Sequence, residues 1–160
     1  MTQPLLDKMR KAFSDSSVMT FSKMIVVDLT ADVHDGGTGR EPFDVSAVIG
    51  FSGDIAGTCA LRMCFATARD AIAKLAGEPV GEWAGIADGV GELVNMIAGN
   101  AKALLDPFKM SLSFPEVIRG AQHEIGFHRH LDMFELNFTS EIGPVAVIVA
   151  YTDPMQPDSR

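Results

Sequence analysis

The sequence predicts an α+β fold: a mostly antiparallel sheet with an N-terminal helix and a packed pair of helices on one side. Stretches rich in β-branched residues follow one another directly at 23–34, 43–53 and 54–64, two helical patterns come next, and further β-rich stretches end the chain. Successive strands joined by short turns pair antiparallel, and helices beside them must bury their apolar faces on the sheet. No linker or repeat divides the chain, so we expect one domain over residues 1–160.

Composition narrows the class of protein. The 160 residues are 47% hydrophobic and 21% charged, and the formal charge of −8 argues against a nucleic-acid partner, because binding to phosphate backbones depends on Lys and Arg. No apolar run approaches the ~20 residues of a membrane span, and the first residues do not form a signal peptide. We therefore expect a cytoplasmic protein that binds neither membrane nor nucleic acid, with Cys59 and Cys64 as buried thiols.

The N-terminal third is expected to form a helix and a hairpin. Apolar residues recur at helical intervals from Leu5 to Phe13, so a helix over about residues 1–18 should end in the serine-rich stretch "SDSSV". The strand at 23–34 should then pair with the strand at 43–53 through the turn "DGGTGREP".

A third strand, at 54–64, leads into the helix pair. The first helix covers 65–77, with Thr67 as its N-cap and Gly77 at its end. The second runs from about 82 to 105, where apolar residues recur at spacings of three and four. Beyond it, strands are expected at 110–120, 124–141 and 144–153, with a loose tail at 153–160.

The long helix carries a narrow polar ridge. At ~100° per residue, Asp88, Glu92, Asn95, Gly99 and Lys102 fall within about 80° of one another. The opposite, apolar side contains Ile86, Val90, Leu93, Val94, Ile97, Ala101, Leu104 and Leu105. The simplest interpretation is a solvated face, since a helix with one buried side must expose the other, and Lys102 can pair with Asp106 one turn on.

Two features of the ridge favour a site. Asn95 stands where Lys, Glu or Ala would stabilise a helix more, and Gly85, Gly89, Gly91 and Gly99 each cost about 1 kcal/mol relative to Ala. Close approach of another backbone, either that of a partner or that of the sheet on which the helix packs, would offset this cost. A carboxylate and an amide one turn apart can clamp a cation and orient a water, whereas no nucleophile or second carboxylate accompanies them.

Three other motifs are weaker candidates. "GFSGD" around Ser52 resembles a nucleophile elbow but leads into a strand, and "DGGTGR" does not open a helix as a phosphate-binding loop would. His128 and His130 would share a strand face near His123 and Glu124, but no second liganding pair accompanies them. We expect a hairpin turn, a loop and no metal site, respectively.

The ridge resembles the signature of the CheX, CheC and FliY phosphatases of bacterial chemotaxis. That signature looks like Asp or Ser, three residues, Glu, two residues, Asn, and a later Pro. Asp88, Glu92 and Asn95 match it in type and spacing, and Pro115 follows after nineteen residues, slightly fewer than in the family pattern. "IGFSGDIAGTCALRM" and "SFPEVIRG" look like the family's order of elements over about 20–152. The chain has one Glu/Asn signature and not two, which makes it more similar to CheX than to CheC. The resemblance thus implies a single CheX-like domain.

The resemblance implies a phosphatase that hydrolyses the aspartyl phosphate of a CheY-like response-regulator receiver domain. It implies that Asn95 orients the attacking water, that Glu92 engages a receiver Lys, that Asp88 steadies the ridge or touches the partner, and that Gly99 lies under the docked receiver. It also implies no cofactor in this chain, a Mg²⁺ ion on the phosphorylated receiver, and a homodimer joined at sheet edges, to which the strand "VAVIVAY" could contribute.

Two other functions stay open at this point. One is a non-catalytic dimeric receiver-binding or scaffold module of the same fold, and the other is an unrelated small-molecule binder. The intact pair of Glu92 and Asn95 favours the enzyme over the scaffold, since a scaffold has no need of a water-orienting amide. A small-molecule binder would require a concave apolar pocket.

Overall fold

The computed structural model describes residues 3–32 and 43–154, and these form three helices and seven strands. In chain order the elements are α1 (Gln3–Ile25), β1 (Thr30–Ala31), β2 (Val45–Gly53), β3 (Gly57–Met63), α2 (Phe65–Ala76), α3 (Trp83–Leu104), β4 (Met110–Leu112), β5 (Glu116–Arg119), β6 (Asp132–Thr139) and β7 (Val145–Tyr151). The sheet has the order β1–β6–β7–β3–β2–β4, with β5 also on β2, and every pairing is antiparallel. The predicted α+β class is confirmed.

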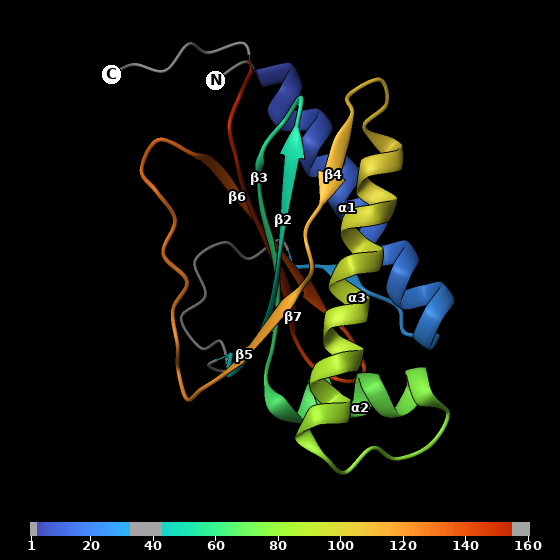
Figure 1. Ribbon diagram of the computed structural model, residues 1–160. Helices are drawn as coiled ribbons and strands as arrows, with labels where there is room; N and C mark the ends of the chain where they lie inside the picture. Colours follow the sequence, from blue (N-terminus) through green and yellow to red (C-terminus); the bar gives the residue numbers. More distant parts are fainter. Residues whose placement is uncertain (1–2, 33–42, 155–160) are drawn as a thin grey trace.

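The core lies between one face of the sheet and the two long helices. Helices α1 and α3 lie side by side on that face, and α2 lies near the N-terminal end of α3 (Figure 1). Alternate residues of β2, from Val45 to Phe51, and of β7, from Val145 to Tyr151, are buried in the core beneath the helices. Across the described part of the chain, no helix combines the length and apolar character of a membrane span.

Strand β7 lies inside the sheet. Val147, for example, pairs with Leu61 of β3 on one side and with Leu136 of β6 on the other. Both backbone edges of the strand are therefore used, and the prediction that "VAVIVAY" supplies a dimer contact at a sheet edge is wrong. Among the described residues, the outer strands are β1 on one side and β4 with β5 on the other.

Helix α1 continues past the predicted 1–18 and ends at Ile25. The serine-rich stretch that predicts its end is buried against α3, where the Ser16 hydroxyl donates to the Ile97 carbonyl. A serine in a helix usually favours a turn because its hydroxyl competes for backbone groups. Here the hydroxyl is satisfied by a neighbouring helix, so the helix continues.

The predicted strand at 23–34 is wrong. The end of α1 occupies its first residues, and only Thr30–Ala31 form a strand, which pairs with β6 and not with β2. Val27 and Leu29 still alternate inward in irregular chain, which is the period that predicts a strand. Residues 23–32 therefore do not form the predicted hairpin with β2, and residues 33–42, which include the turn "DGGTGREP", lie outside the described residues.

The helix pair is confirmed, with one wrong cap. Helices α2 and α3 match the predicted bounds to within one residue at each end, and Gly77 ends α2 with a left-handed φ of 76°. The N-cap of α2 is Cys64 and not Thr67. The Thr67 hydroxyl instead donates to the Ile142 carbonyl at 2.8 Å, which joins α2 to the turn before β7.

The last third of the chain is more interrupted than predicted. The expected strand at 110–120 is split into β4 and β5, and the next strand begins only at Asp132. The residues between β5 and β6, 120–131, pass over the sheet face opposite the helices (Figure 1). There His123 Nε2 lies 2.7 Å from the Ser46 hydroxyl. This segment leaves the α3 side of the molecule open.

Candidate functional site

Helix α3 presents its polar ridge to solvent, as predicted. Asp88, Glu92 and Asn95 are exposed and Gly99 is half-buried, whereas most apolar residues on the other side are buried. Leu104, predicted on the apolar side, is the last residue of the helix and is instead 47% exposed.

The position of α3 is fixed from several sides. Its buried stripe packs on β2 and β5, and Asn100 donates a hydrogen bond to the Thr20 hydroxyl of α1 at 3.2 Å. The guanidinium of Arg119 in β5 lies 4.0 Å from the Phe65 ring centroid and 5.1 Å from that of Trp83. These cation–π contacts join β5 to the first turns of α2 and α3. The ridge is therefore carried by a rigid element, as a precise site requires.

The glycines of α3 have different surroundings. A Cβ added to Gly89 would lie 2.7 Å from the Ile72 side chain, so α2 approaches closely at that point. A Cβ on Gly91 would lie 3.5 Å from Pro115, and one on Gly99 would meet nothing within 4 Å. Packing within the fold explains Gly89, whereas Gly99 is uncovered.

A short segment between β4 and β5 stands beside the ridge. Ser113 makes two hydrogen bonds with Gly50 of β2: its N–H donates to the Gly50 carbonyl and its hydroxyl accepts from the Gly50 N–H, each at 2.9 Å. Phe114 follows and is 94% exposed, and Pro115 comes next, facing Gly91 of α3. Because a residue before proline is restricted to extended backbone, the main chain of Phe114 is fixed while its ring lies in solvent.

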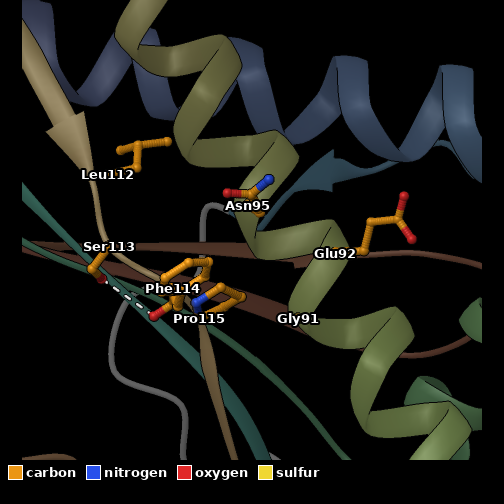
Figure 2. Close-up of a pocket in the computed structure, with 7 residues that line it drawn as sticks. All are labelled: Gly91, Glu92, Asn95, Leu112, Ser113, Phe114 and Pro115. Carbon is orange, nitrogen blue, oxygen red and sulfur yellow. Dashed lines mark hydrogen bonds between the residues drawn. The ribbon is translucent and has the colours of Figure 1, made fainter.

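Helix α3 and this segment border an open hollow of about 590 Å³ (Figure 2). It is lined by Gly91, Glu92, Asn95, Leu112, Ser113, Phe114 and Pro115. In Figure 2, Asn95 lies between Glu92 and the segment 112–115, and the Glu92 carboxylate extends away from that segment. The structure thus brings Glu92 and Asn95 to one hollow, leaves Asp88 outside its lining, and places Gly99 in a neighbouring hollow.

The side chains of the ridge are available to a partner. Within the described residues, the side chains of Asp88, Glu92 and Asn95 have neither a hydrogen bond nor an ion pair. A carboxylate accepts hydrogen bonds and pairs with cations, and an amide both donates and accepts, but neither group here is a strong nucleophile. The pair suits the positioning of a water and the clamping of a cation.

Other motifs offer no competing site in the part of the chain that the structure describes. No group of three His, Cys, Asp or Glu side chains there could hold a metal ion, and His128 and His130 lie in a loop and not on the expected strand. Cys59 is fully buried, and burial raises its pKa to about 12, so its thiolate does not form near neutral pH. Ser52 precedes a hairpin turn, as predicted.

Sequence patterns indicate the α3 side of the hollow and give little sign of the opposite wall. Leu112, Ser113 and Phe114 are not predicted site residues, and the only signal for them is an aromatic residue directly before the signature Pro in "SFPE". The predicted pair of Lys102 and Asp106 is also wrong. Asp106 lies beyond the last helical residue, where residues four apart are no longer neighbours on one face, and the two side chains form no ion pair.

Comparisons with known proteins agree with this arrangement. The sequence model of the family described as "Chemotaxis phosphatase CheX" matches residues 45–139. The structure is similar to CheX from Desulfovibrio desulfuricans (TM-score 0.80, 23% identity, covering 90% of this chain and 99% of that one) and to CheX from Vibrio vulnificus (0.77, 24%, 89% and 95%). A CheX–CheY–BeF3–Mg²⁺ complex from Borrelia burgdorferi gives a TM-score of 0.75 at 21% identity, covering 91% and 98%. The comparison with curated proteins gives no match.

The matched residues make up more than half of the chain and include the whole hollow. Solved CheX structures share its fold over about nine-tenths of its length. The resemblance found in the sequence is thereby confirmed: the chain belongs to the CheX family of chemotaxis phosphatases.

Proposed function

We propose that this chain hydrolyses the aspartyl phosphate of a CheY-like receiver domain that docks over the hollow beside α3. The observation that carries the proposal is that Glu92 and Asn95 are exposed, unpaired within the described residues, and held on a rigid helix beside an open hollow. Family membership supports phosphatase chemistry, and the relative from Borrelia burgdorferi forms a complex with CheY.

The reaction demands little of this chain, because an acyl phosphate is already reactive. The oxygen of a water bonds to phosphorus while the bond between phosphorus and the receiver's carboxylate oxygen breaks, which releases inorganic phosphate, the free carboxylate and a proton. The Asn95 amide oxygen accepts a hydrogen bond from that water and holds it in line with the breaking bond. Such positioning lowers the barrier without a proton acceptor. Mg²⁺ belongs to the phosphorylated receiver, and this chain supplies no cofactor.

Glu92 pairs with a Lys of the receiver. Its carboxylate extends away from the segment 112–115 (Figure 2), so it reaches a different part of the partner than Asn95 does. An ion pair away from the attacked phosphorus helps to fix the orientation in which the receiver docks. Asp88 extends the contact with the receiver toward the N-terminus of α3, and Gly99 extends it toward the C-terminus.

A homodimer remains part of the proposal. In the described part of the sheet, an edge contact would have to use β1 or the pair β4 and β5, because β7 is interior. Light scattering coupled to size-exclusion chromatography would measure the mass, and a monomer at micromolar concentration would overturn the dimer.

Phosphate release from a phosphorylated CheY-like receiver in Mg²⁺ tests the proposed function. Wild-type protein should accelerate release, and Asn95→Ala should lower kcat by about 100-fold, the loss typical of one oriented polar group, with little change in affinity or folding. Asn137→Ala, which removes an amide from β6, is the matched control. Full turnover by Asn95→Ala would overturn the role of Asn95. Wild-type binding without acceleration would instead favour the non-catalytic scaffold.

A further inference from the structure

Phe114 has an unusual position for an exposed apolar residue. It is 94% exposed, compared with 81% for Val26 and 55% for Met133. Single exposed apolar residues are ordinary on protein surfaces. Phe114 differs from the other two because it lines the hollow that contains Asn95, next to the apolar residue Pro115 (Figure 2).

The main chain that carries Phe114 is held on both sides. Before it, Ser113 is bonded twice to Gly50, and the Ser113 hydroxyl also donates to the Phe114 carbonyl at 3.3 Å. After it, β5 begins with Glu116 paired to Val48 of β2. The ring therefore stands on a fixed backbone, and a partner that covers it loses little main-chain entropy.

We propose that Phe114 is a docking anchor for the phosphorylated receiver, an inference that rests on the proposed function. On docking, apolar receiver surface beside the phosphorylated aspartate covers the ring and excludes bulk water from that side of the hollow. Glu92 pairs on the other side, and Asn95 lies between the two contacts. Three separated contacts fix the orientation of the receiver. Aromatic side chains suit this role, because they bury a large apolar area and are enriched at interface cores.

The anchor contributes binding and not chemistry. The phenyl ring has no group that accepts a proton or directs a water, so its loss should act on the affinity for the receiver. Phe114→Ala should raise KM and Kd by about 10- to 100-fold, as expected from burial of one aromatic side chain, and leave kcat within about twofold. Phe114→Leu keeps much of the apolar area and should raise Kd by only about threefold. Neither change should alter folding, since the ring contributes almost no buried area.

The experiment has a binding arm and a turnover arm. Wild type, Phe114→Ala, Phe114→Leu and the control Met133→Ala are titrated with a CheY-like receiver carrying BeF3⁻ and Mg²⁺, and steady-state phosphate release is measured with the phosphorylated receiver. Met133→Ala removes an exposed apolar side chain from β6 and should match wild type.

The outcomes separate the two proposals. A Phe114→Ala variant that binds as tightly as wild type, or that loses kcat at unchanged KM, overturns the anchor alone. A wild-type protein that neither binds the receiver nor releases phosphate overturns the proposed function and the anchor together. A wild-type protein that binds without turnover overturns the phosphatase proposal, while the titration still decides the role of Phe114.

Discussion

Gly91 of α3 lies close to Pro115, so that a Cβ added to Gly91 would lie 3.5 Å from the Pro115 ring, an ordinary van der Waals contact. Gly89 has no such room, because its Cβ would lie 2.7 to 2.9 Å from three atoms of Ile72. One substitution should therefore have opposite signs at two neighbouring positions. We expect Gly91→Ala to raise the free energy of unfolding by up to about 1 kcal/mol through helix propensity, and Gly89→Ala to lower it by about 1–3 kcal/mol through overpacking.

Urea unfolding followed by circular dichroism measures both changes. The double variant Gly89→Ala/Ile72→Val removes one of the three crowded atoms, so its loss should be smaller than the sum of the two single losses. Equal stability changes at Gly89 and Gly91 would contradict the packing assigned to them.

Charge reversal at Glu92 should weaken docking. Glu92→Lys replaces attraction to the receiver's Lys by repulsion, and we expect Kd to rise by about 10- to 100-fold at low salt and by less at high salt. Glu78→Lys is the matched control, because it makes the same charge change at an exposed position beyond α2. Calorimetric titration at two ionic strengths gives both values. Equal affinities for the two variants would rule out the ion pair at Glu92.

Helix α3 is predictable because its signal is local. Its apolar residues repeat every three or four positions, from Ile86 to Ala101, and all that the helix needs is a surface to cover them. The second half of α1 is different. Ser16 predicts a helix end when read alone, but its hydroxyl donates to the Ile97 carbonyl, 81 residues away along the chain. A contact of that kind is set by tertiary packing and leaves no trace in the local pattern.

The candidate site divides in the same way. Glu92 and Asn95 are predictable, since their spacing alone places them on one face of a helix. The wall formed by Phe114 depends on how β4 and β5 pair with β2 on either side of it. Pro115 is a local sign that the stretch 110–120 does not form one continuous strand, but the order of its residues does not show that the ring of Phe114 is left in solvent.

A large side chain at Gly99 should block docking without harming the fold. A Cβ there meets nothing within 4 Å, so Gly99→Phe can be accommodated and should gain some helix propensity. If the receiver covers this part of the ridge, Kd should rise by about tenfold or more, since an added ring clashes with a docked partner. Ala76→Phe, at the exposed end of α2, is the control. Unchanged affinity in Gly99→Phe would place Gly99 outside the interface.

The hydroxyl of Tyr151 is buried and has no hydrogen-bond partner among the described residues. A buried polar group without a partner costs free energy, so Tyr151→Phe should raise the free energy of unfolding by about 1 kcal/mol near neutral pH. The aromatic contact with Phe134, at 6.2 Å between ring centroids, remains in the variant. Urea unfolding at pH 7 gives the difference, and a destabilised variant would show that the hydroxyl is satisfied.

The same residue should make stability fall at alkaline pH. Burial, together with the negative charges of Asp132 and Asp153, raises the pKa of Tyr151 from 10.0 to about 12. Because the folded-state pKa is above the unfolded one, ionisation of this phenol costs no stability well below pH 10, and stability is lost as the pH rises from 10 toward 12. Cys59 acts in the same direction, since burial raises its pKa from 9.0 to about 12. Tyr151→Phe should therefore reduce the loss of stability at alkaline pH. Ionisation of the Cys59 thiol should cause the loss that remains in the variant. Urea midpoints between pH 8 and pH 11.5 measure the slope, and equal slopes in the two proteins would mean that the phenol does not contribute to it.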